Sequence, residues 1–426
     1  MKKYLIILAL AAGQLCAAQP DFEQYPNPEF AKMIYEQPWI ANLNACPYEL
    51  AITPGKLSKA PRGYKPFYIS HYGRHGSRSG WDQDKYEIII GALTKAKEDG
   101  ILSASGDSLL QETILVKEAT NKMDGRLTVR GQREHREIAD RMYKNFRRVF
   151  RRGSHNIRAT SSIVPRCIVS MAAFTNRLSE LNQNLNIVMD CGEEIQKEVS
   201  NDRGHEITTN RRIIMDTIRS AMNRDCSAMM SRLFTDVEAA GKIVEDPFRL
   251  SHAICSVARI SRSFDFDFNT YRFVPFDIIY EWADYHNLYM YVGECNSLEF
   301  GDIRMERTEP LVRMIVRQAD DALANGNVAA DIRFGHDYPL MALCSYIGVE
   351  GISERYDWRE AQKHFISTFY APFAGNLQLI FYRSRKADKP VLVKVLMNER
   401  EVHLNGLEPV QGMYYSWEEL REKISC

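Results

Sequence analysis

The sequence has no long apolar run. No segment reaches the roughly 18 apolar residues that a membrane-spanning helix needs. It also lacks an excess of basic charge, since 55 lysines and arginines balance 55 aspartates and glutamates. A broad nucleic-acid-binding surface needs such an excess. We therefore expect no membrane span and no nucleic-acid partner, and any anion must be bound by a local cluster of arginines.

The spacing of the cysteines excludes one kind of site but does not reveal the disulfide pairing. The nine cysteines form no C-x-x-C pair, which argues against a structural zinc site. Cys167 and Cys344 lie in apolar helical patterns, so we expect buried thiols there. The disulfide pairing cannot be read from the spacing, and the sequence shows no internal repeat and no sign of an obligate protein partner.

The N-terminus is typical of a bacterial export signal. A basic start, Met1-Lys2-Lys3, precedes the apolar stretch Tyr4–Ala12, and small residues end at Ala18. We expect residues 1–18 to be a signal peptide cleaved after Ala18. Attachment of lipid at Cys16 is an alternative, but it is disfavoured because Leu15 is not the small residue usual before such a cysteine. The expected location is the periplasm or the outside of the cell.

The most unusual stretch is Ser70–Ser79, which follows an expected strand. Glycines at 73 and 76 allow a sharp turn. The turn brings Arg74, His75 and Arg78 together, and two guanidinium groups beside an imidazole suit a dianion such as phosphate. The alternative is a solvated basic loop with a structural histidine.

Patterning along the chain predicts an α/β fold. Its mostly parallel central sheet is flanked by helices, and a mainly helical domain is inserted. We expect the core to comprise residues 19–192 and 304–426, with residues 193–303 as the inserted cap. Residues 19–60 are expected to lie over the surface, and residues 98–125 to be rich in turns. The expected strands are 64–71, 156–160, 186–189, 328–334, 376–383 and 391–398, and the last two should form a hairpin.

Two later strand-to-helix junctions carry reactive residues. The first holds Arg158, and the second holds His336 and Asp337. Because such junctions meet at the carboxyl edge of a parallel sheet, we expect these residues to share a crevice with His75. Each also has a structural alternative: a buried histidine for His336, a helix N-cap for Asp337 and an ion pair for Arg158. A metal site at His71 and His75 is disfavoured, since the glycine turn prevents the helical geometry that would align the two rings.

In this order the motifs resemble the histidine phosphatase superfamily. Arg74-His75-Gly76-Ser77-Arg78, then Leu127-Thr128 with Gly131, then Arg158 and finally His336-Asp337 are similar to its acid phosphatase and phytase branch, which includes the multiple inositol polyphosphate phosphatases. The chain departs from that pattern in Ser79-Gly80 after the second arginine. It also has His336-Asp337-Tyr338 where the inositol polyphosphate phosphatases tend to carry His-Ala-Glu.

The resemblance implies a phosphoglycerate-mutase-like core and a role for each matching residue. His75 would be the nucleophile that forms a phosphohistidine, and Asp337 would protonate the leaving group. Arg74, Arg78, Arg158 and His336 would hold the phosphoryl oxygens. The arginines would supply the positive charge, so neither a metal nor another cofactor is expected. The requirement for a protonated Asp337 predicts an acidic-to-neutral optimum.

The leading interpretation is therefore an exported phosphomonoesterase that acts on a small phosphate ester, with inositol polyphosphates such as phytate as candidates. A mutase-like phosphoryl transferase would share the nucleophile, and a phosphate-binding protein on an inactive scaffold is the non-enzyme alternative. Export argues against the first, and the presence of both His75 and Asp337 argues against the second. Candidates for holding further phosphates are Lys122, Arg130, Arg203, Arg211, Arg212 and Arg224.

Overall fold

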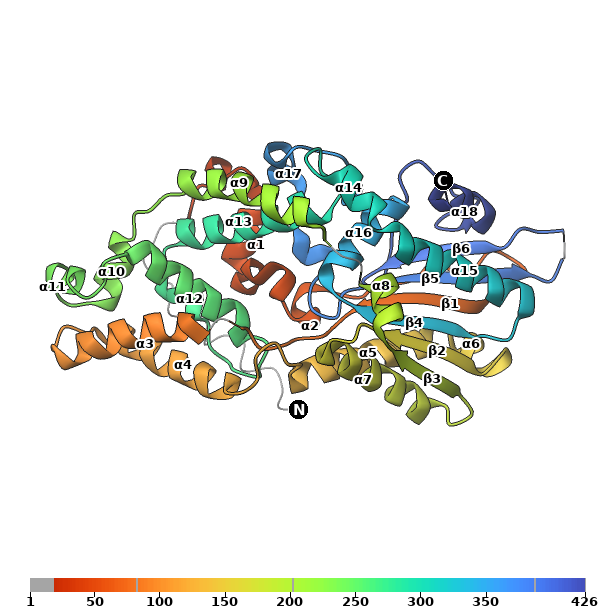
Figure 1. The fold of residues 1–426 in the computed structure, drawn as a ribbon, viewed down its shortest axis with the longest axis horizontal. Coiled ribbons are helices and arrows are strands. Elements are labelled where there is room, and N and C mark those ends of the chain that lie inside the picture. The colour runs from red at the N-terminus through yellow and green to blue at the C-terminus, as the bar shows by residue number, and fades with distance from the viewer. Residues whose placement is uncertain (1–18, 82, 201–202, 387, 426) are drawn as a thin grey trace.

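The computed structural model describes residues 19–81, 83–200, 203–386 and 388–425, so the expected signal peptide lies outside it. Its central element is a sheet of eight strands in the order β3-β2-β4-β1-β5-β6-β7, with β8 paired to β6 (Figure 1). The strands are β1 (Tyr64–Arg74), β2 (Asn156–Ser161), β3 (Asn186–Cys191), β4 (Ala330–Gly335), β5 (Asn376–Ser384), β6 (Leu392–Met397), β7 (Arg400–Glu401) and β8 (Tyr415–Ser416).

The sheet has a parallel half and an antiparallel half. β3, β2, β4 and β1 pair in parallel, whereas β5 runs antiparallel to β1 and forms the expected hairpin with β6. The α/β class is confirmed, although among the described residues parallel pairing is limited to these four strands. Because parallel strands place their carboxyl ends at one edge, β1, β2 and β4 deliver the residues that follow them to the same place.

Helices cover both faces of the sheet. Alternate side chains of β1 point to opposite faces, so Tyr68 and Tyr72 join one hydrophobic core and Ile69 joins the other. Full burial of each such side chain contributes about 1.5–3 kcal/mol. The helices of the Ile69 face are α5 (Val129–Asn145), α6 (Arg147–Arg152) and α7 (Pro165–Leu181). Those of the opposite face are α15 (Glu309–Asn325), α16 (Asp337–Ile347) and α18 (Trp417–Ser425).

The helical half of the molecule draws on more of the chain than the predicted cap. Beside the sheet in Figure 1, one hydrophobic core joins residues 30–43, residues 86–116 and residues 222–283. The expectation that residues 19–60 lie over the surface was therefore wrong, since Phe30, Ile34 and Leu43 are buried there. Its helices are α1 (Pro28–Glu36), the 3-10 helix η3 (Pro38–Ala45), α3 (Gln83–Glu98), α4 (Ala104–Thr120), α10 (Ser227–Leu233), α11 (Val237–Gly241), α12 (Pro247–Ser261) and α13 (Phe276–Glu294).

The α4 helix corrects the expectation of turns at residues 98–125. Ser103 caps it by accepting a hydrogen bond from the backbone of Gly106, and Leu109 and Val116 pack into the helical core. Polar residues lie between the apolar ones in this segment, so the sequence did not show the apolar face of the helix clearly. The other elements are α2 (Tyr48–Ala51), α8 (Glu193–Val199), α9 (His205–Ala221), α14 (Gly301–Glu306), α17 (Trp358–His364) and the 3-10 helices η2 (Phe22–Gln24), η4 (Thr270–Phe273) and η5 (Ser367–Phe369).

Within the described ranges, none of the helices combines the length and the apolar character needed to cross a bilayer.

Candidate active site

Two of the predicted junctions meet at the carboxyl edge of the parallel half. β1 ends at Arg74, so His75 is the first residue beyond it. β4 ends at Gly335, and His336 and Asp337 open the next helix. The ring centroids of His75 and His336 lie 5.6 Å apart. The sheet topology therefore brings these junctions together as the sequence predicted.

His75 is buried in a single defined tautomer. Its Nδ1 atom lies 2.9 Å from the carbonyl oxygen of Gly76. Because a carbonyl oxygen only accepts hydrogen bonds, Nδ1 carries the ring proton and Nε2 keeps its lone pair. Burial and the charges of Arg74 and Arg166 hold the pKa of His75 well below its usual value. The imidazole is therefore neutral and has a nucleophilic nitrogen.

Three guanidinium groups act on this ring: Arg74 and Arg78 from the turn, and Arg166 from the first turn of α7. Burial lowers the pKa of Arg74 and Arg78, and repulsion from Arg166 lowers both further. Arginine nevertheless stays charged in proteins. The cluster thus concentrates positive charge in a buried place, which a dianion would relieve.

Asp337 is tied to this cluster by Arg74 and by Asn44 of η3. Its Oδ2 atom lies 3.0 Å from Nη2 of Arg74 and accepts a hydrogen bond of 2.8 Å from Nδ2 of Asn44. Arg74 also donates to the carbonyl oxygen of Asn44. Burial alone would raise the pKa of Asp337, but Arg74 and Arg203 outweigh it and hold the pKa below its usual value. Asp337 is therefore ionised before an anion binds.

His336 is also neutral and oriented. Its Nδ1 atom lies 3.2 Å from Nη2 of Arg166, which can only donate, so the ring proton is on Nε2. That nitrogen lies 3.3 Å from Oγ of Ser162. Burial and the charge of Arg166 lower the pKa of His336 to about 3. The ring of Tyr338 stacks on it at 5.4 Å with an angle of 6° between the planes.

Arg158 lies elsewhere, which differs from the sequence expectation. It sits in the middle of β2 opposite Asp331, which is five residues before His336. At about 3.3 Å per strand residue, the edge of the sheet is roughly 16 Å away. The guanidinium bonds instead to Asp331 at 2.6 Å and to Asp321 at 2.7 Å. The ion pair, which was the structural alternative for Arg158, is what the structure shows.

A buried glutamate fixes the turn between Arg74 and Arg78. Glu134 of α5 accepts hydrogen bonds of 2.7 Å from both the backbone and the hydroxyl of Ser77, and one of 3.0 Å from the backbone of Tyr48. At Gly76, a Cβ atom would lie 2.4 Å from the carbonyl oxygen of Gly131. Only glycine therefore allows the turn to pack against α5. Thr128 caps α5 by accepting a hydrogen bond from the backbone of Gly131.

Sequence reasoning missed three residues of this site: Asn44, Glu134 and Arg166. Arg166 had a local signal, because it follows Pro165 at the start of the helix after β2, where a side chain reaches the edge of the sheet. Asn44 had none, since its position depends on the packing of the N-terminal segment. Glu134 looked like one more charged residue of an amphipathic helix.

His71 and Cys167 have structural surroundings. The ring of His71 packs between Phe174 and Phe334, at centroid distances of 5.3 and 5.6 Å, on the opposite side of the strand from Tyr72. Cys167 and Cys344 are both buried, as expected, and the thiol of Cys167 lies against the carbonyl oxygen of Gly335.

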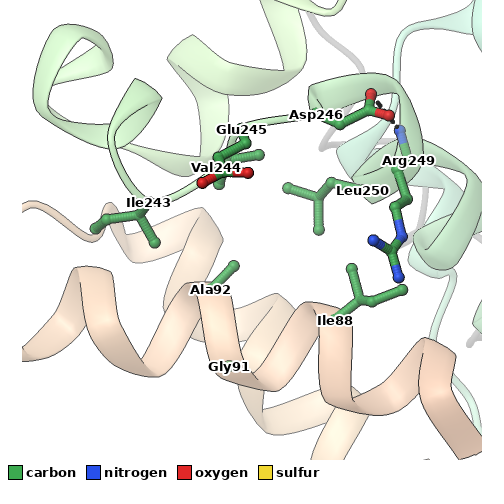
Figure 2. Close-up of a pocket in the computed structure, with 9 residues that line it drawn as sticks. All are labelled: Ile88, Gly91, Ala92, Ile243, Val244, Glu245, Asp246, Arg249 and Leu250. Carbon is green, nitrogen blue, oxygen red and sulfur yellow. Dashed lines mark hydrogen bonds between the residues drawn. The ribbon is translucent and has the colours of Figure 1, made fainter.

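A cavity open to the surface lies away from these residues. It has a volume of about 340 Å³ and sits between α3 and the segment that precedes α12 (Figure 2). Ile88, Ala92, Val244 and Leu250 give it a largely apolar wall, and Asp246 points away to cap α12 through the backbone of Arg249. It contains none of the candidate catalytic residues.

The site defines an α/β protein with a neutral histidine in a cluster of arginines. Residues 73–398 match the model of the histidine phosphatase superfamily, branch 2. The chain therefore belongs to this family and is a histidine-type phosphatase. A search of curated protein sequences finds no match.

Solved structures with a similar fold include two enzymes. The multiple inositol polyphosphate phosphatase of Bifidobacterium longum, in complex with phosphate, shares 17% identity over 91% of this chain and 97% of its own, with a TM-score of 0.73. The phytase from D. castellii shares 10% identity over 91% of this chain and 85% of its own, with a TM-score of 0.67. At these identities the likeness establishes the fold.

Proposed function

We propose that this phosphatase hydrolyses phosphate monoesters through a phosphohistidine on His75. The observation that carries the proposal is the neutral His75 ring, whose Nε2 lone pair is available among the charges of Arg74, Arg78 and Arg166. Attack by a neutral nitrogen divides hydrolysis into two easier steps.

In the first step Nε2 of His75 attacks phosphorus, an N–P bond forms, and the bond from phosphorus to the ester oxygen breaks. The proton on Nδ1 is held by the carbonyl oxygen of Gly76, and the imidazolium charge that develops is balanced by the phosphoryl group. Asp337 gives its proton to the departing oxygen, so an alcohol leaves.

In the second step a water molecule attacks phosphorus and the N–P bond breaks. The Asp337 carboxylate accepts the proton of the water, which restores both the acid and the neutral His75. The products are inorganic phosphate and the alcohol of the first step, so atoms and protons balance. No metal ion is needed, because arginine side chains supply the positive charge.

Asp337 must first gain a proton, and the substrate provides the reason. The free carboxyl is ionised because Arg74 and Arg203 outweigh the effect of burial. A bound phosphate dianion would satisfy Arg74 and add a negative charge beside the carboxyl, which raises its pKa. Protonation of the donor is thereby coupled to substrate binding.

For the phosphoryl oxygens we assign Arg74, Arg78, Arg166 and His336. Arg166 takes the place that the resemblance gave to Arg158, whose guanidinium is occupied by Asp331 and Asp321. Preorganised donors of this kind each contribute about 10²–10³-fold to the rate in other enzymes.

We further propose inositol polyphosphates, such as phytate, as the substrate class. Two guanidinium groups of the expected insertion lie near Asp337, since the charge of Arg203 acts on its carboxyl and Arg259 contacts Asn44, which donates to it. Arg203 has a side chain that is 34% exposed and lies 2.9 Å from Glu294, and Arg259 donates to Oδ1 of Asn44 at 3.1 Å. These groups suit additional phosphates of one ligand. The fold likeness to a phytase and to an inositol polyphosphate phosphatase supports the same class.

Other basic candidates fit this role less well. Arg211 is 2% exposed and bonded to Glu294, whereas Arg130 pairs with Glu49 and Asp265. The buried side chain of Arg211 cannot reach a ligand as the partly exposed Arg203 can, and the charge of Arg130 is shared between two carboxylates. We keep the proposal that the protein is exported, which rests on the pattern of residues 1–18.

The test is a comparison of initial rates on phytate, a sugar phosphate, a nucleotide and an aryl phosphate with a chelator present. Phosphate release from phytate should be fastest, and the His75→Ala variant should release none. His205→Ala, which removes an exposed histidine of α9, is the matched control and should keep wild-type rates. Wild-type turnover by His75→Ala would refute the mechanism, and equal rates on all four esters would refute the substrate class.

A further inference from the structure

Trp81 follows Ser79-Gly80, the residues that depart from the family pattern, and its ring lies against two arginines of the phosphate site. Cζ of Arg78 is 3.6 Å from the centroid of the Trp81 ring, and Cζ of Arg166 is 5.1 Å from it. One indole therefore contacts two arginines that come from different elements, the turn after β1 and the start of α7. Half of its own surface, 51%, remains exposed.

The two arginines otherwise have few partners. Nη1 of Arg78 donates to the carbonyl oxygen of Ser79 at 2.7 Å, and Nη2 of Arg166 donates to His336. Their Nε atoms are buried and have no hydrogen-bond partner within the described ranges. Two like charges this close repel each other. The π face of an indole attracts both without neutralising either, which a carboxylate would do.

The backbone holds the indole in place. Ser77 and Ser79 pair with Thr128 and Arg126 through backbone hydrogen bonds of 2.9 and 3.0 Å, so the segment that ends in Trp81 is fixed against the entry to α5. At Gly125, whose φ is +62°, a Cβ atom would lie 2.3 Å from Nε1 of Trp81. The ring edge therefore rests directly on this glycine, and any side chain at 125 would displace it.

We propose that Trp81 is a positioning and specificity-determining residue. Its inner contacts hold Arg78 and Arg166 in the orientation that receives a phosphate group. Its exposed half receives the leaving group of the ester, and it favours leaving groups with a flat or apolar face, such as an aryl ring or the C–H face of a cyclitol. The role of Trp81 in receiving the leaving group rests on the proposed function, whereas its role in positioning the two arginines does not require hydrolysis.

The first arm of the test is calorimetric binding of inorganic phosphate, which needs no turnover. Trp81→Leu should weaken binding about 5- to 30-fold, which corresponds to two lost cation–π contacts. Trp81→Phe should weaken it no more than about 3-fold, since phenylalanine keeps the aromatic face. The matched control is Trp358→Leu, which removes a tryptophan that carries Arg359 at 4.3 Å on α17, and it should bind phosphate as the wild type does.

The second arm compares KM and kcat for an aryl phosphate and a short alkyl phosphate. Trp81→Leu should raise KM for the aryl ester more than for the alkyl ester, with kcat changing less than KM. Phosphate binding by Trp81→Leu that equals the wild type, or a Trp81→Phe variant as weak as Trp81→Leu, would overturn the positioning role. An unchanged aryl-to-alkyl ratio of KM would overturn the specificity role. If the wild type binds phosphate and Trp81→Leu weakens that binding, but the wild type hydrolyses no ester, the proposed function alone is refuted.

Discussion

Arg158 and Arg166 belong to one strand-helix unit and lie eight residues apart, yet their surroundings are opposite. Arg158 lies between two carboxylates in the middle of strand β2, and its hydrogen bond with Asp331 raises its pKa. Arg166 lies at the edge of the sheet, against the Trp81 ring and the imidazole of His336. The charge of Arg158 is neutralised by carboxylates of the protein, whereas that of Arg166 is available to an anion.

The comparison shows what makes an arginine a ligand for phosphate. Position at the carboxyl end of a strand matters more than proximity along the chain, because only the edge of the sheet is open to a ligand. The partner matters as well, since an aromatic ring holds a guanidinium group without cancelling its charge.

The largest expected effect separates the nucleophile from the groups around it. His75→Ala should lower kcat/KM on any phosphate ester by at least ~10³-fold, because the remaining arginines bind phosphate but cannot form the intermediate. Steady-state assays measure this, and phosphate binding by calorimetry should persist. A variant that lost binding together with activity would show that the change had disrupted the site rather than removed a nucleophile.

The loss of rate that follows removal of the proton donor should depend on the leaving group of the ester. Asp337→Asn should slow hydrolysis of an alkyl phosphate by about 10²–10⁴-fold, because an alkoxide needs a proton to leave. An aryl phosphate with an acidic phenol as leaving group should lose far less in the first step. Equal losses for the two esters would contradict the role of Asp337 as a general acid.

The pH dependence follows from the same carboxyl. Its acid form is the active one, so kcat on an alkyl ester should fall as pH rises through the pKa that Asp337 has with substrate bound. His75 does not oppose this trend at acidic pH, since its pKa is held far below the usual value and the ring stays neutral. A profile that is flat from about pH 4 to about pH 9 would contradict it.

A pair of variants tests whether Arg166, and not Arg158, binds the phosphoryl group. Arg166→Ala should lower kcat/KM by about 10²–10³-fold with little change in the free energy of unfolding. Arg158→Ala should leave kcat/KM nearly unchanged but lower the free energy of unfolding by ~2–3 kcal/mol, because Asp331 is 1% exposed and would lose its charged partner. Chemical denaturation and kinetics on both proteins measure this. The reverse outcome would restore Arg158 to the site.

The smallest expected effect concerns the support of the turn. Glu134→Gln keeps the shape of the side chain but replaces one accepting oxygen with an NH2 group. That group is a donor and would face the donors of Ser77 or Tyr48, so at least one hydrogen bond is lost. We expect a loss of about 1–3 kcal/mol in unfolding free energy and roughly a tenfold loss in kcat/KM. A variant with wild-type kinetics would show that the position of Arg78 does not depend on this bond.

The elements with strong local patterns could be predicted from the sequence. The strands before His75 and before His336 were expected, and so was the hairpin of β5 and β6. Each depends on residues within a few positions of one another. The meeting of His75 with His336 needed one further rule, that parallel strands end at a common edge.

The remaining parts depend on packing between distant segments. Asn44 reaches Asp337 only because the N-terminal segment is buried in the helical half. The same core includes α3 and α4, so no boundary in the sequence marks where the sheet domain gives way to helices. For Arg158, the sequence showed a charged residue in a strand but not the two carboxylates that bind it.

The central claim is that His75 carries the phosphoryl group between the two steps. The most direct measurement is to mix Asp337→Asn with an aryl phosphate, quench at alkaline pH, where an N–P bond survives, and map the modified peptide by mass spectrometry. The account predicts one phosphoryl group on the peptide that contains His75, lost on brief treatment with acid and absent when His75 is also replaced by alanine. An acid-stable phosphoryl group, or one on any other residue, would contradict it.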